Sequence, residues 1–525
     1  MSVGTQPDLS VKKSRGFFQR FLDMVEVVGN KFPAPFILFT ILAVLVLILS
    51  VAFDGTSVSI VDKSGKPMLV KVTSLVNAEG FRYILENMVR NFVNFPPLGL
   101  VVVMMLAMGL AEATGLIGAL VRKILMGVPA WAVTATVFAA SIMAHLASDA
   151  AMVIMPATAA AIFASMGRNP ILGMSVAFAA TAAGFSANFV PTGTDALLSG
   201  ITATAIGNIP QTANSPSHLL INYYFMSSSA VILTIVGTII AEKVVAPRLA
   251  GMEIDLSAGN SSSENALTPE ELKGLKYAGL TALVYLSLIL ALTIPETGLL
   301  RNPTTHTLVP SSPLLTGMIP LLFFFFVFTG TAFGIGKGII KSSDDIPKFL
   351  MQGLNGAMSF IVTAFAAAQF IAWFNKTNLA TVIAVKGAGV LQDFDFTGIP
   401  LIIAFIIVCA FVDLFMMSGS AKWLFMAPIF VPMFGLLGYQ PALTQAAYRV
   451  GESCLNGISP LNYYMPVILG IMSKYTKNAD TAGMGTLMAT QIPYAFAFLL
   501  AWSAWLLVFM FLDLPLGPGA SVFIK

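Results

Sequence analysis

Charged residues are scarce in this chain, and their scarcity excludes most classes of protein. Asp, Glu, Lys and Arg make up 10% of the 525 residues, whereas a soluble domain keeps about 25% charged residues to face water. The net charge of +3 offers no basic surface for nucleic acid, so no such partner is expected. The hydrophobic content of 57% and the mean hydropathy of +0.85 predict a helical protein that spans the lipid bilayer repeatedly.

Cysteine, histidine and catalytic motifs are also scarce. The only cysteines, Cys409 and Cys454, lie in apolar runs, so neither a disulfide framework nor a cysteine metal site is predicted. There is no H-E-x-x-H motif and no phosphate-binding loop. The adjacent acidic pair Asp344 and Asp345 belongs to a basic loop. An ion channel and an intramembrane enzyme are kept as alternatives, but we expect a transporter that needs no cofactor.

Long apolar runs predict the membrane spans, since each can cross about 30 Å of hydrocarbon. They lie near 33–53, 95–114, 218–241, 276–295, 314–336, 355–374, 397–417 and 487–512. In 130–210 and 418–472 the apolar pieces are shorter and are cut by Pro, Gly, Ser and Asn. Residues 54–80 alternate polar and apolar positions around "DKSGKP", which predicts a small β-hairpin. "TPEE" predicts a helix start with Thr268 as cap and Glu271 completing a capping box.

The two interrupted regions share one pattern and predict an inverted repeat. In each, a Ser-rich start leads into an apolar helix, a Gly-x-x-Pro turn follows (167–170 and 438–441), and a second helix ends at Asn188 or Asn456. Basic loops at 241–276 and 337–348 and a nearly uncharged loop at 296–313 give the two halves opposite orientations. The same count places the N-terminus in the cytoplasm. Inverted repeats with broken helices are typical of alternating-access transporters.

One polar stripe runs through the second interrupted region. Gln445, Arg449, Glu452 and Asn456 are spaced at i, i+4, i+7 and i+11 and so share a helix face. An intramembrane Arg costs about 2.5–3.5 kcal/mol even on a lenient insertion scale. Such a charge faces a cavity, pairs or does work. A self-neutralising Arg449–Glu452 pair is the alternative, but the length of the stripe favours the wall of a cavity.

Other polar residues are expected to converge on this stripe. Asp195 follows the broken end of the first repeat, and such a carboxylate in a low-dielectric site can carry a proton. Asp149 and Ser420 lie at the starts of the two predicted hairpins, where free backbone groups can hold an ion. Trp423 offers a ring face for an aromatic substrate, or simply packs. Asp413 and Lys422 are expected to pair, in a structural role.

Several stretches in the same order resemble the AbgT family of p-aminobenzoyl-glutamate transporters, which includes sulfonamide efflux pumps. They are "GNKFPAPFILF", "SDAAMVIMP", "GFSANF", "TDALLSGI", "APIFVPMF", "AAYRVGES" and "LPLGPG". The resemblance implies an all-α polytopic protein of about nine transmembrane helices and two re-entrant hairpins. It also implies a homodimer in the bacterial inner membrane, and p-aminobenzoyl-glutamate or sulfonamides as substrates. The coupling ion, H⁺ or Na⁺, and the direction of transport stay open.

The resemblance also implies a set of site residues. The substrate-binding positions are Asp195, Ser420, Trp423, Pro441, Arg449, Glu452 and Pro460. Arg449 suits the carboxylates of the substrate and Trp423 its aminobenzoyl ring. The chain departs from the family at Glu452, where relatives usually have Asp, and at Lys422, where they have an uncharged residue. The ion-coupling candidates are Asp149, Asn188, Asp195, Glu452 and Asn456, with Asn188 and Asn456 proposed for Na⁺ from the repeat.

The chain divides into seven consecutive segments on these patterns. They are an amphipathic segment (1–32), the first span with its exported loop (33–93), the first repeat (94–241), a cytoplasmic linker (242–275), two spans (276–350), the second repeat (351–475) and the last span (476–525).

Overall fold

The computed structural model describes residues 33–61, 66–125, 128–146, 151–256, 267–477 and 483–524, and these residues are mostly helical. The amphipathic segment predicted at 1–32 lies outside the described residues, and so does Asp149. The helices of the first part, up to the end of α11, are α2 (Pro35–Ala52), α3 (Ala78–Val93), α4 (Pro96–Ala113), α5 (Leu116–Leu125), α6 (Val133–Met143), α7 (Ala151–Ser165), α8 (Pro170–Ala182), α9 (Gly193–Ile206), α10 (Tyr223–Ile240), the π-helix η2 (Ala241–Val245) and α11 (Ala246–Leu249). The later helices are α12 (Pro269–Thr293), α13 (Pro313–Thr316), α14 (Met318–Lys337), α15 (Asp345–Lys376), α16 (Leu379–Asp393), α17 (Gly398–Asp413), α18 (Gly419–Leu436), α19 (Pro441–Cys454), the 3₁₀-helix η4 (Asn456–Ile458), α20 (Met465–Lys474) and α21 (Met484–Phe511).

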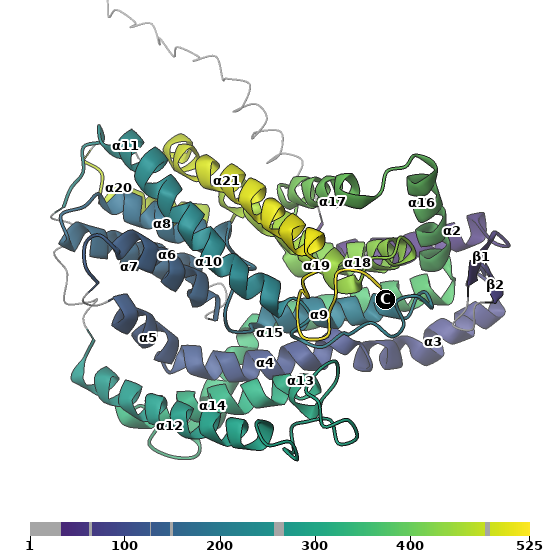
Figure 1. Ribbon diagram of the computed structural model, residues 1–525, viewed down its shortest axis with the longest axis horizontal. Coiled ribbons are helices and arrows are strands. Elements are labelled where there is room, and N and C mark those ends of the chain that lie inside the picture. Colours follow the sequence, from purple (N-terminus) through teal and green to yellow (C-terminus); the bar gives the residue numbers. More distant parts are fainter. Residues whose placement is uncertain are drawn as a thin grey trace, which may run out of the picture.

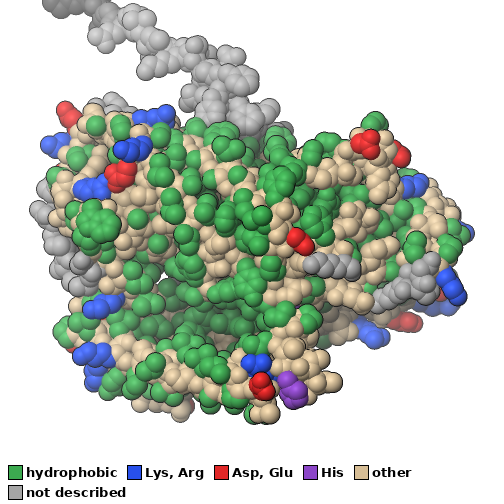
Figure 2. Space-filling view, in the orientation of Figure 1, with side chains coloured by type: hydrophobic (Ala, Val, Ile, Leu, Met, Phe, Trp, Pro, Cys, Tyr) green, Lys and Arg blue, Asp and Glu red, His purple; other side chains and the backbone are tan. Residues whose placement is uncertain are grey.

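The long helices have the length and the surface of membrane spans. Eight helical segments in the described part of the chain are long and apolar enough to cross a bilayer. In α12, Leu280 and Leu283 are each 64% exposed, which only lipid or another apolar surface makes favourable. Figure 2 shows most of the Lys, Arg, Asp and Glu side chains of this face toward the two ends of the long axis, with a largely apolar surface and few charges between them. The prediction of an all-α polytopic membrane protein is confirmed.

The small elements outside the spans agree with the sequence patterns. Strands β1 (Ser57–Val61) and β2 (Pro67–Lys71) form an antiparallel hairpin in which Val58 lies opposite Val70, beside α3 (Figure 1). At the start of α12 the Thr268 side chain accepts from the Glu271 backbone N–H at 3.2 Å, which is half of the predicted capping box. The Glu271 carboxylate accepts in return from the Thr268 N–H.

The helices α3 and α4 follow each other so closely that residues 78–113 form one long helical segment. The segment boundary predicted at 93/94 therefore falls inside this segment. Pro96 and Pro97 stand at the start of α4, where their missing N–H groups cost nothing. This long segment packs along α15, which in turn packs on α2 (Figure 1).

Two helical hairpins correspond to the two interrupted regions. Helix α7 packs against α8, and α18 packs against α19. Each hairpin turns at a glycine in the left-handed region, Gly167 at φ +69° and Gly438 at φ +88°. Each second helix then starts on a proline, Pro170 in α8 and Pro441 in α19, whose fixed φ suits the first helical turn. The predicted Gly-x-x-Pro turns thus have the same backbone plan in both regions.

Glycines also allow the second helix of each hairpin to approach its neighbour closely. A Cβ added at Gly173 of α8 would lie 2.6 Å from the carbonyl oxygen of Ala159 in α7. A Cβ at Gly451 of α19 would lie 2.4 Å from the carbonyl oxygen of Ile406 in α17. Both positions therefore require glycine for close helix packing.

The turn of the second hairpin is bound to the last residues of the chain. The Gln440 N–H donates to the Val522 carbonyl at 3.0 Å, and the Ile524 N–H donates to the Gly438 carbonyl at 2.8 Å. Between them Tyr439 and Phe523 form an antiparallel bridge. We call residues 438–440 and 522–524 together the terminal clasp. It joins the α18–α19 turn to the segment that follows α21.

Candidate functional site

Helix α19 carries polar side chains through the centre of the molecule. All 14 of its residues are buried, and Arg449 is only 1% and Glu452 2% exposed. A charge in such surroundings is tolerated only when it is paired and hydrogen-bonded. The partners of these side chains therefore define the site, and they come from α9, α17 and α18.

The guanidinium of Arg449 pairs with the carboxylate of Asp195. Arg449 Nη1 lies 2.6 Å from Asp195 Oδ1. The other oxygen, Oδ2, accepts from the Thr192 backbone N–H at 2.7 Å and from Asn188 Nδ2 at 3.2 Å. Asp195 is thereby fixed at the start of α9, just after the broken end of the first hairpin. The alternative of an Arg449–Glu452 pair is wrong, because Glu452 has a different cationic neighbour.

That cationic neighbour is Lys422 in the first turn of α18. Its Nζ donates to Asp413 Oδ1 at the end of α17 and lies 3.7 Å from Glu452 Oε2. The Ser186 hydroxyl donates to the other oxygen of Glu452, Oε1, at 2.9 Å. The predicted pairing of Asp413 with Lys422 is confirmed. We call Asp413, Lys422 and Glu452 the charged triad.

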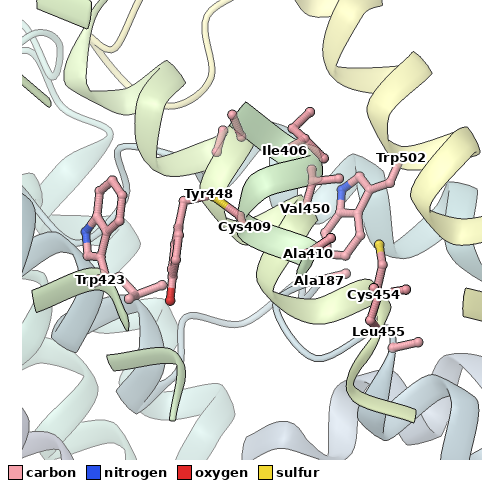
Figure 3. Packing of buried hydrophobic residues seen from close by; sticks show 14 of the residues in the cluster. Ala187, Ile406, Cys409, Ala410, Trp423, Tyr448, Val450, Cys454, Leu455 and Trp502 are labelled. Atoms are coloured by element: carbon pink, nitrogen blue, oxygen red, sulfur yellow. The ribbon is translucent and has the colours of Figure 1, made fainter. Parts of the chain in front are cut away.

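Aromatic side chains lie beside the charges. The Trp423 and Tyr448 rings stack with centroids 4.5 Å apart and planes 28° apart, and Figure 3 shows them facing each other between α18 and α19. Trp423 Nε1 donates to Thr202 Oγ1 at 2.9 Å, and Gln445 Nε2 donates to the same oxygen at 2.6 Å. In this conformation Tyr448 covers one face of the Trp423 ring.

Several buried polar atoms of the site have no hydrogen-bond partner among the described residues. They are Arg449 Nε, Gln445 Oε1, Thr444 Oγ1, Asp413 Oδ2 and Asn456 Oδ1. Buried polar groups in native proteins are nearly always hydrogen-bonded, so a group of such atoms requires an explanation. Donors and acceptors of both kinds are present, and they suit a polar ligand or an ion.

The remaining predicted residues lie around this centre. Ser420 is in the first turn of α18, with Oγ 3.3 Å from Ser418 Oγ. Pro441 begins α19, and Pro460 follows η4. Asn456 Nδ2 donates to the Ala182 carbonyl at 3.5 Å, which joins the broken ends of the two hairpins. Asn188 and Asn456 thus have separate partners, and the sodium site assigned to them stays a prediction.

Sequence reasoning missed three contributors. Thr202 lies seven residues after Asp195 and shares its face of α9, so helical spacing could have found it. Ser186 and Tyr448 gave no signal, because their roles depend on contacts between distant segments. In the part of the chain that the structure describes, no group of three or more His, Cys, Asp and Glu side chains is suited to a metal ion.

A polar cavity opens beside α9, with Thr204 in its wall. It has a volume of about 280 Å³ and is lined by side chains from α3, the start of α4, α9 and α15. Its polar lining residues are Asn87, Arg90, Asn91, Asn94, Thr204 and Asn375. A larger cavity of about 600 Å³ between α2, α16, α17 and α18 is apolar apart from Lys386. Only the first has the composition of a path for an anion.

Comparison with known proteins agrees with this geometry. Residues 20–524 match the sequence model of the AbgT putative transporter family. The chain is 37% identical to the p-aminobenzoyl-glutamate transport protein of Escherichia coli (strain K12), over 94% of this chain and 95% of that protein.

Two solved structures have the same fold. The MtrF structure of Neisseria gonorrhoeae, described as illuminating a class of antimetabolite efflux pumps, matches with a TM-score of 0.88 and 36% identity, over 95% of this chain and all (100%) of that one. The YdaH transporter of Alcanivorax borkumensis matches with a TM-score of 0.85 and 32% identity, over 93% and 100% of the two chains.

Apolar spans packed around a buried set of paired charges, in a chain with these relatives, define a polytopic membrane transporter rather than an enzyme. The chain belongs to the AbgT family, as the family match and the overall identity show.

Proposed function

We propose that this protein is a secondary active transporter that carries p-aminobenzoyl-glutamate and related aromatic acids, driven by a gradient of H⁺ or Na⁺. The observation that supports it best is the buried Arg449, whose guanidinium is paired with the carboxylate of Asp195, on the helix that also supplies Tyr448 to the stack with Trp423. A guanidinium is the side chain best suited to a carboxylate. The planar ring of an aromatic substrate can stack on the rings of such an aromatic pair.

In this conformation the proposed binding groups are closed off from solvent. The Arg449 and Asp195 side chains are 1% and 7% exposed. A carboxylate of the substrate therefore has to compete with Asp195 for Arg449, after the α18–α19 hairpin has moved. Because a protonated Asp195 would no longer hold the guanidinium, proton binding and substrate binding would favour each other. This is how the site would couple an ion gradient to transport.

The polar cavity between α3, α4, α9 and α15 would give the substrate a route toward the site. Arg90 and the asparagines that line it attract and hydrogen-bond carboxylates. Thr204, in its wall, belongs to the same helix as Asp195 and Thr202 of the site but to a different face of it, so the cavity and the site lie on two sides of α9. We propose this cavity as the vestibule that leads to Arg449, with the N-terminus and the loops around Lys337 and Lys348 in the cytoplasm.

Export of sulfonamides is the second candidate. It is favoured by the similarity to MtrF, which is described among antimetabolite efflux pumps. A sulfonamide carries an aminobenzene ring but no glutamate, so it would use the Trp423–Tyr448 stack and depend less on Arg449. A homodimer in the bacterial inner membrane is part of the proposal and is tested by the mass of the purified protein in lipid.

The test is flux of labelled p-aminobenzoyl-glutamate in proteoliposomes, with a proton or a sodium gradient imposed in turn. We expect one gradient to drive the label and Asp195→Asn to abolish the effect. Glu271→Gln is the matched control, since Glu271 is also an N3 carboxylate in an ion pair, with Arg122 at 2.8 Å. Equal loss in both variants would mean that the Asp195 effect is structural. Movement of a sulfonamide without movement of the label would favour the second candidate.

A further inference from the structure

The apolar cavity between α2, α16, α17 and α18 has no part in the proposed transport site. Its volume is about 600 Å³, the size of a pocket for a ligand. Every residue that lines it is apolar except Lys386. A buried water needs about two to four polar partners, which these walls do not supply. An empty cavity would forfeit the packing contacts of its walls. The contents that suit this cavity are therefore hydrocarbon.

The cavity opens toward the lipid rather than toward the centre of the molecule. Three of its lining side chains, Phe53, Val390 and Val408, are roughly half exposed and form its rim. Its deeper wall includes Leu379 and Phe434, which are fully buried. Exposed apolar side chains on a membrane-spanning protein face lipid, because no water competes for them there. A lipid chain therefore has direct access to the cavity from the bilayer.

The single charge of the lining lies at the level expected for lipid headgroups. Helix α16 runs across the direction of α17, at the end of the molecule that carries the β1–β2 hairpin (Figure 1), and it packs against β1. Figure 2 shows charged side chains at the same end. Lys386 is exposed and pairs with no carboxylate among the described residues. A lysine can lay its aliphatic stem along apolar surface and keep its ammonium group at the interface.

The cavity also borders the hairpin that forms the proposed transport site. Phe430, Met433 and Phe434 of α18 make up one of its walls. Pro428 and Pro432 lie inside α18, and each removes a backbone hydrogen bond from the helix. This stretch of α18 therefore depends more on side-chain packing than an uninterrupted helix does. Whatever fills the cavity supports α18 where its own backbone supports it least.

We propose that the apolar cavity binds one acyl chain of an anionic phospholipid, whose phosphate pairs with Lys386 at the rim. The chain supplies apolar contacts along the walls, and the headgroup adds an attraction between opposite charges. The anionic aromatic substrate suits the cavity less well, because its amide and its amine would be buried without hydrogen-bond partners. The lipid site goes beyond the proposed transport function and does not depend on the identity of the substrate.

The first test is a titration of the purified full chain, in a neutral detergent, with phosphatidylglycerol or with phosphatidylcholine of the same acyl chains. Phosphatidylglycerol should raise the melting temperature at the lower concentration, since a ligand of the folded state stabilises it. Lys386→Gln should weaken the effect of phosphatidylglycerol about fivefold, the factor expected for one basic residue near anionic lipid, and leave that of phosphatidylcholine unchanged. Lys386→Arg should behave like the wild type. Lys71→Gln is the matched control, since Lys71 is an exposed lysine of β2 outside the lining.

The second test fills the cavity with a side chain. Ala404 of α17 lines it, so the ring of Ala404→Phe takes the place of the lipid chain. Phosphatidylglycerol that is spin-labelled on its acyl chain should show an immobilised fraction on the wild type, and this fraction should be lost in Ala404→Phe. Ala291→Phe, at an exposed position of α12, is the matched control and should keep it. If Ala404→Phe fails to fold, the Lys386 variants still decide the proposal.

The proposal is overturned if the two lipids act alike on the wild type, or if Lys386→Gln keeps the preference for phosphatidylglycerol. An immobilised fraction that persists in folded Ala404→Phe would overturn it as well. Displacement of the labelled lipid by p-aminobenzoyl-glutamate would instead assign the cavity to the substrate. Failure of the proposed function is distinguishable, because a wild type that binds the lipid as expected but moves no p-aminobenzoyl-glutamate would keep the lipid site and lose the substrate assignment.

Discussion

In the first hairpin every residue of α8 is buried and none is charged, whereas α19, its counterpart in the second hairpin, buries Arg449 and Glu452. The backbones match, with a left-handed glycine before a proline in each turn. The side chains that the two hairpins bury differ in charge. The first half of the chain supplies Asp195 and Ser186, which answer the charges of the second half from just beyond α8. Two hairpins with the same kind of turn therefore contribute to one shared site rather than to two equivalent ones.

The largest effect is expected when one arginine of each hairpin is replaced. Arg449→Ala leaves Asp195 buried without its cation, so we expect a loss of about 3–5 kcal/mol of folding stability and of all substrate binding. Arg168→Gln, at the turn of the first hairpin, breaks a partly exposed pair with Glu242 (2.6 Å) and should cost at most about 1 kcal/mol. Melting temperatures in detergent and binding of p-aminobenzoyl-glutamate decide it. Similar losses of stability in both variants would contradict the predicted difference between the two hairpins.

A second test concerns the hydroxyl of Thr202 in α9, which accepts hydrogen bonds from side chains of α18 and α19. Thr202→Val leaves Trp423 Nε1 and Gln445 Nε2 without their acceptor. Each unsatisfied buried donor costs about 1–3 kcal/mol, and weaker substrate binding should follow as the Trp423–Tyr448 stack loosens. Thr204→Val, two residues further along α9, is the control for fluorescence and stability, since the Thr204 hydroxyl donates to a backbone carbonyl of its own helix. Trp423 fluorescence reports the change, and an unchanged spectrum in Thr202→Val would contradict the prediction.

Much of this comparison could be predicted from the sequence, and the reason is local. The glycine and proline turns, the apolar spans and the β-hairpin follow from residues that act on their own backbone. The sequence singled out Arg449 as a side chain that needs a partner or a cavity, because an unpaired intramembrane charge is costly. Its partner was not, since three carboxylates lie near two cations and only the packing of α9, α17 and α18 decides which pairs form. Tyr448 and Ser186 were missed for the same reason.

A third test should give equal results in the two hairpins. Gly173→Ala and Gly451→Ala each place a Cβ against a backbone carbonyl, at 2.6 and 2.4 Å. Overpacking of this kind costs about 1–3 kcal/mol, and both variants should melt earlier by similar amounts. Gly279→Ala in α12, where an added Cβ meets nothing within 4 Å, is the control. A large effect in only one hairpin would show that the scaffolds are not equivalent.

The smallest expected effect is a coupling between Gly419 and Glu452. Gly419→Ala should be destabilising alone, because its Cβ would crowd the Glu452 carboxylate at 2.6 Å. The shorter side chain of Glu452→Asp relieves the crowding, so the double variant should recover about 1 kcal/mol of the sum. Melting temperatures of the four proteins give the coupling. Additive losses would mean that the length of Glu452 does not depend on the missing side chain of Gly419.

The terminal clasp has a practical consequence for anyone who handles this protein. Residues 522–524 are bound to the turn of the α18–α19 hairpin by two backbone hydrogen bonds around one bridge, so an affinity tag or a fluorescent fusion after residue 525 would be attached to the hairpin that the proposed transport cycle moves. Trimming these residues would loosen the same turn. A spin label placed beside Phe523 would instead become a reporter, because its distance to the rest of the molecule follows the hairpin through the cycle.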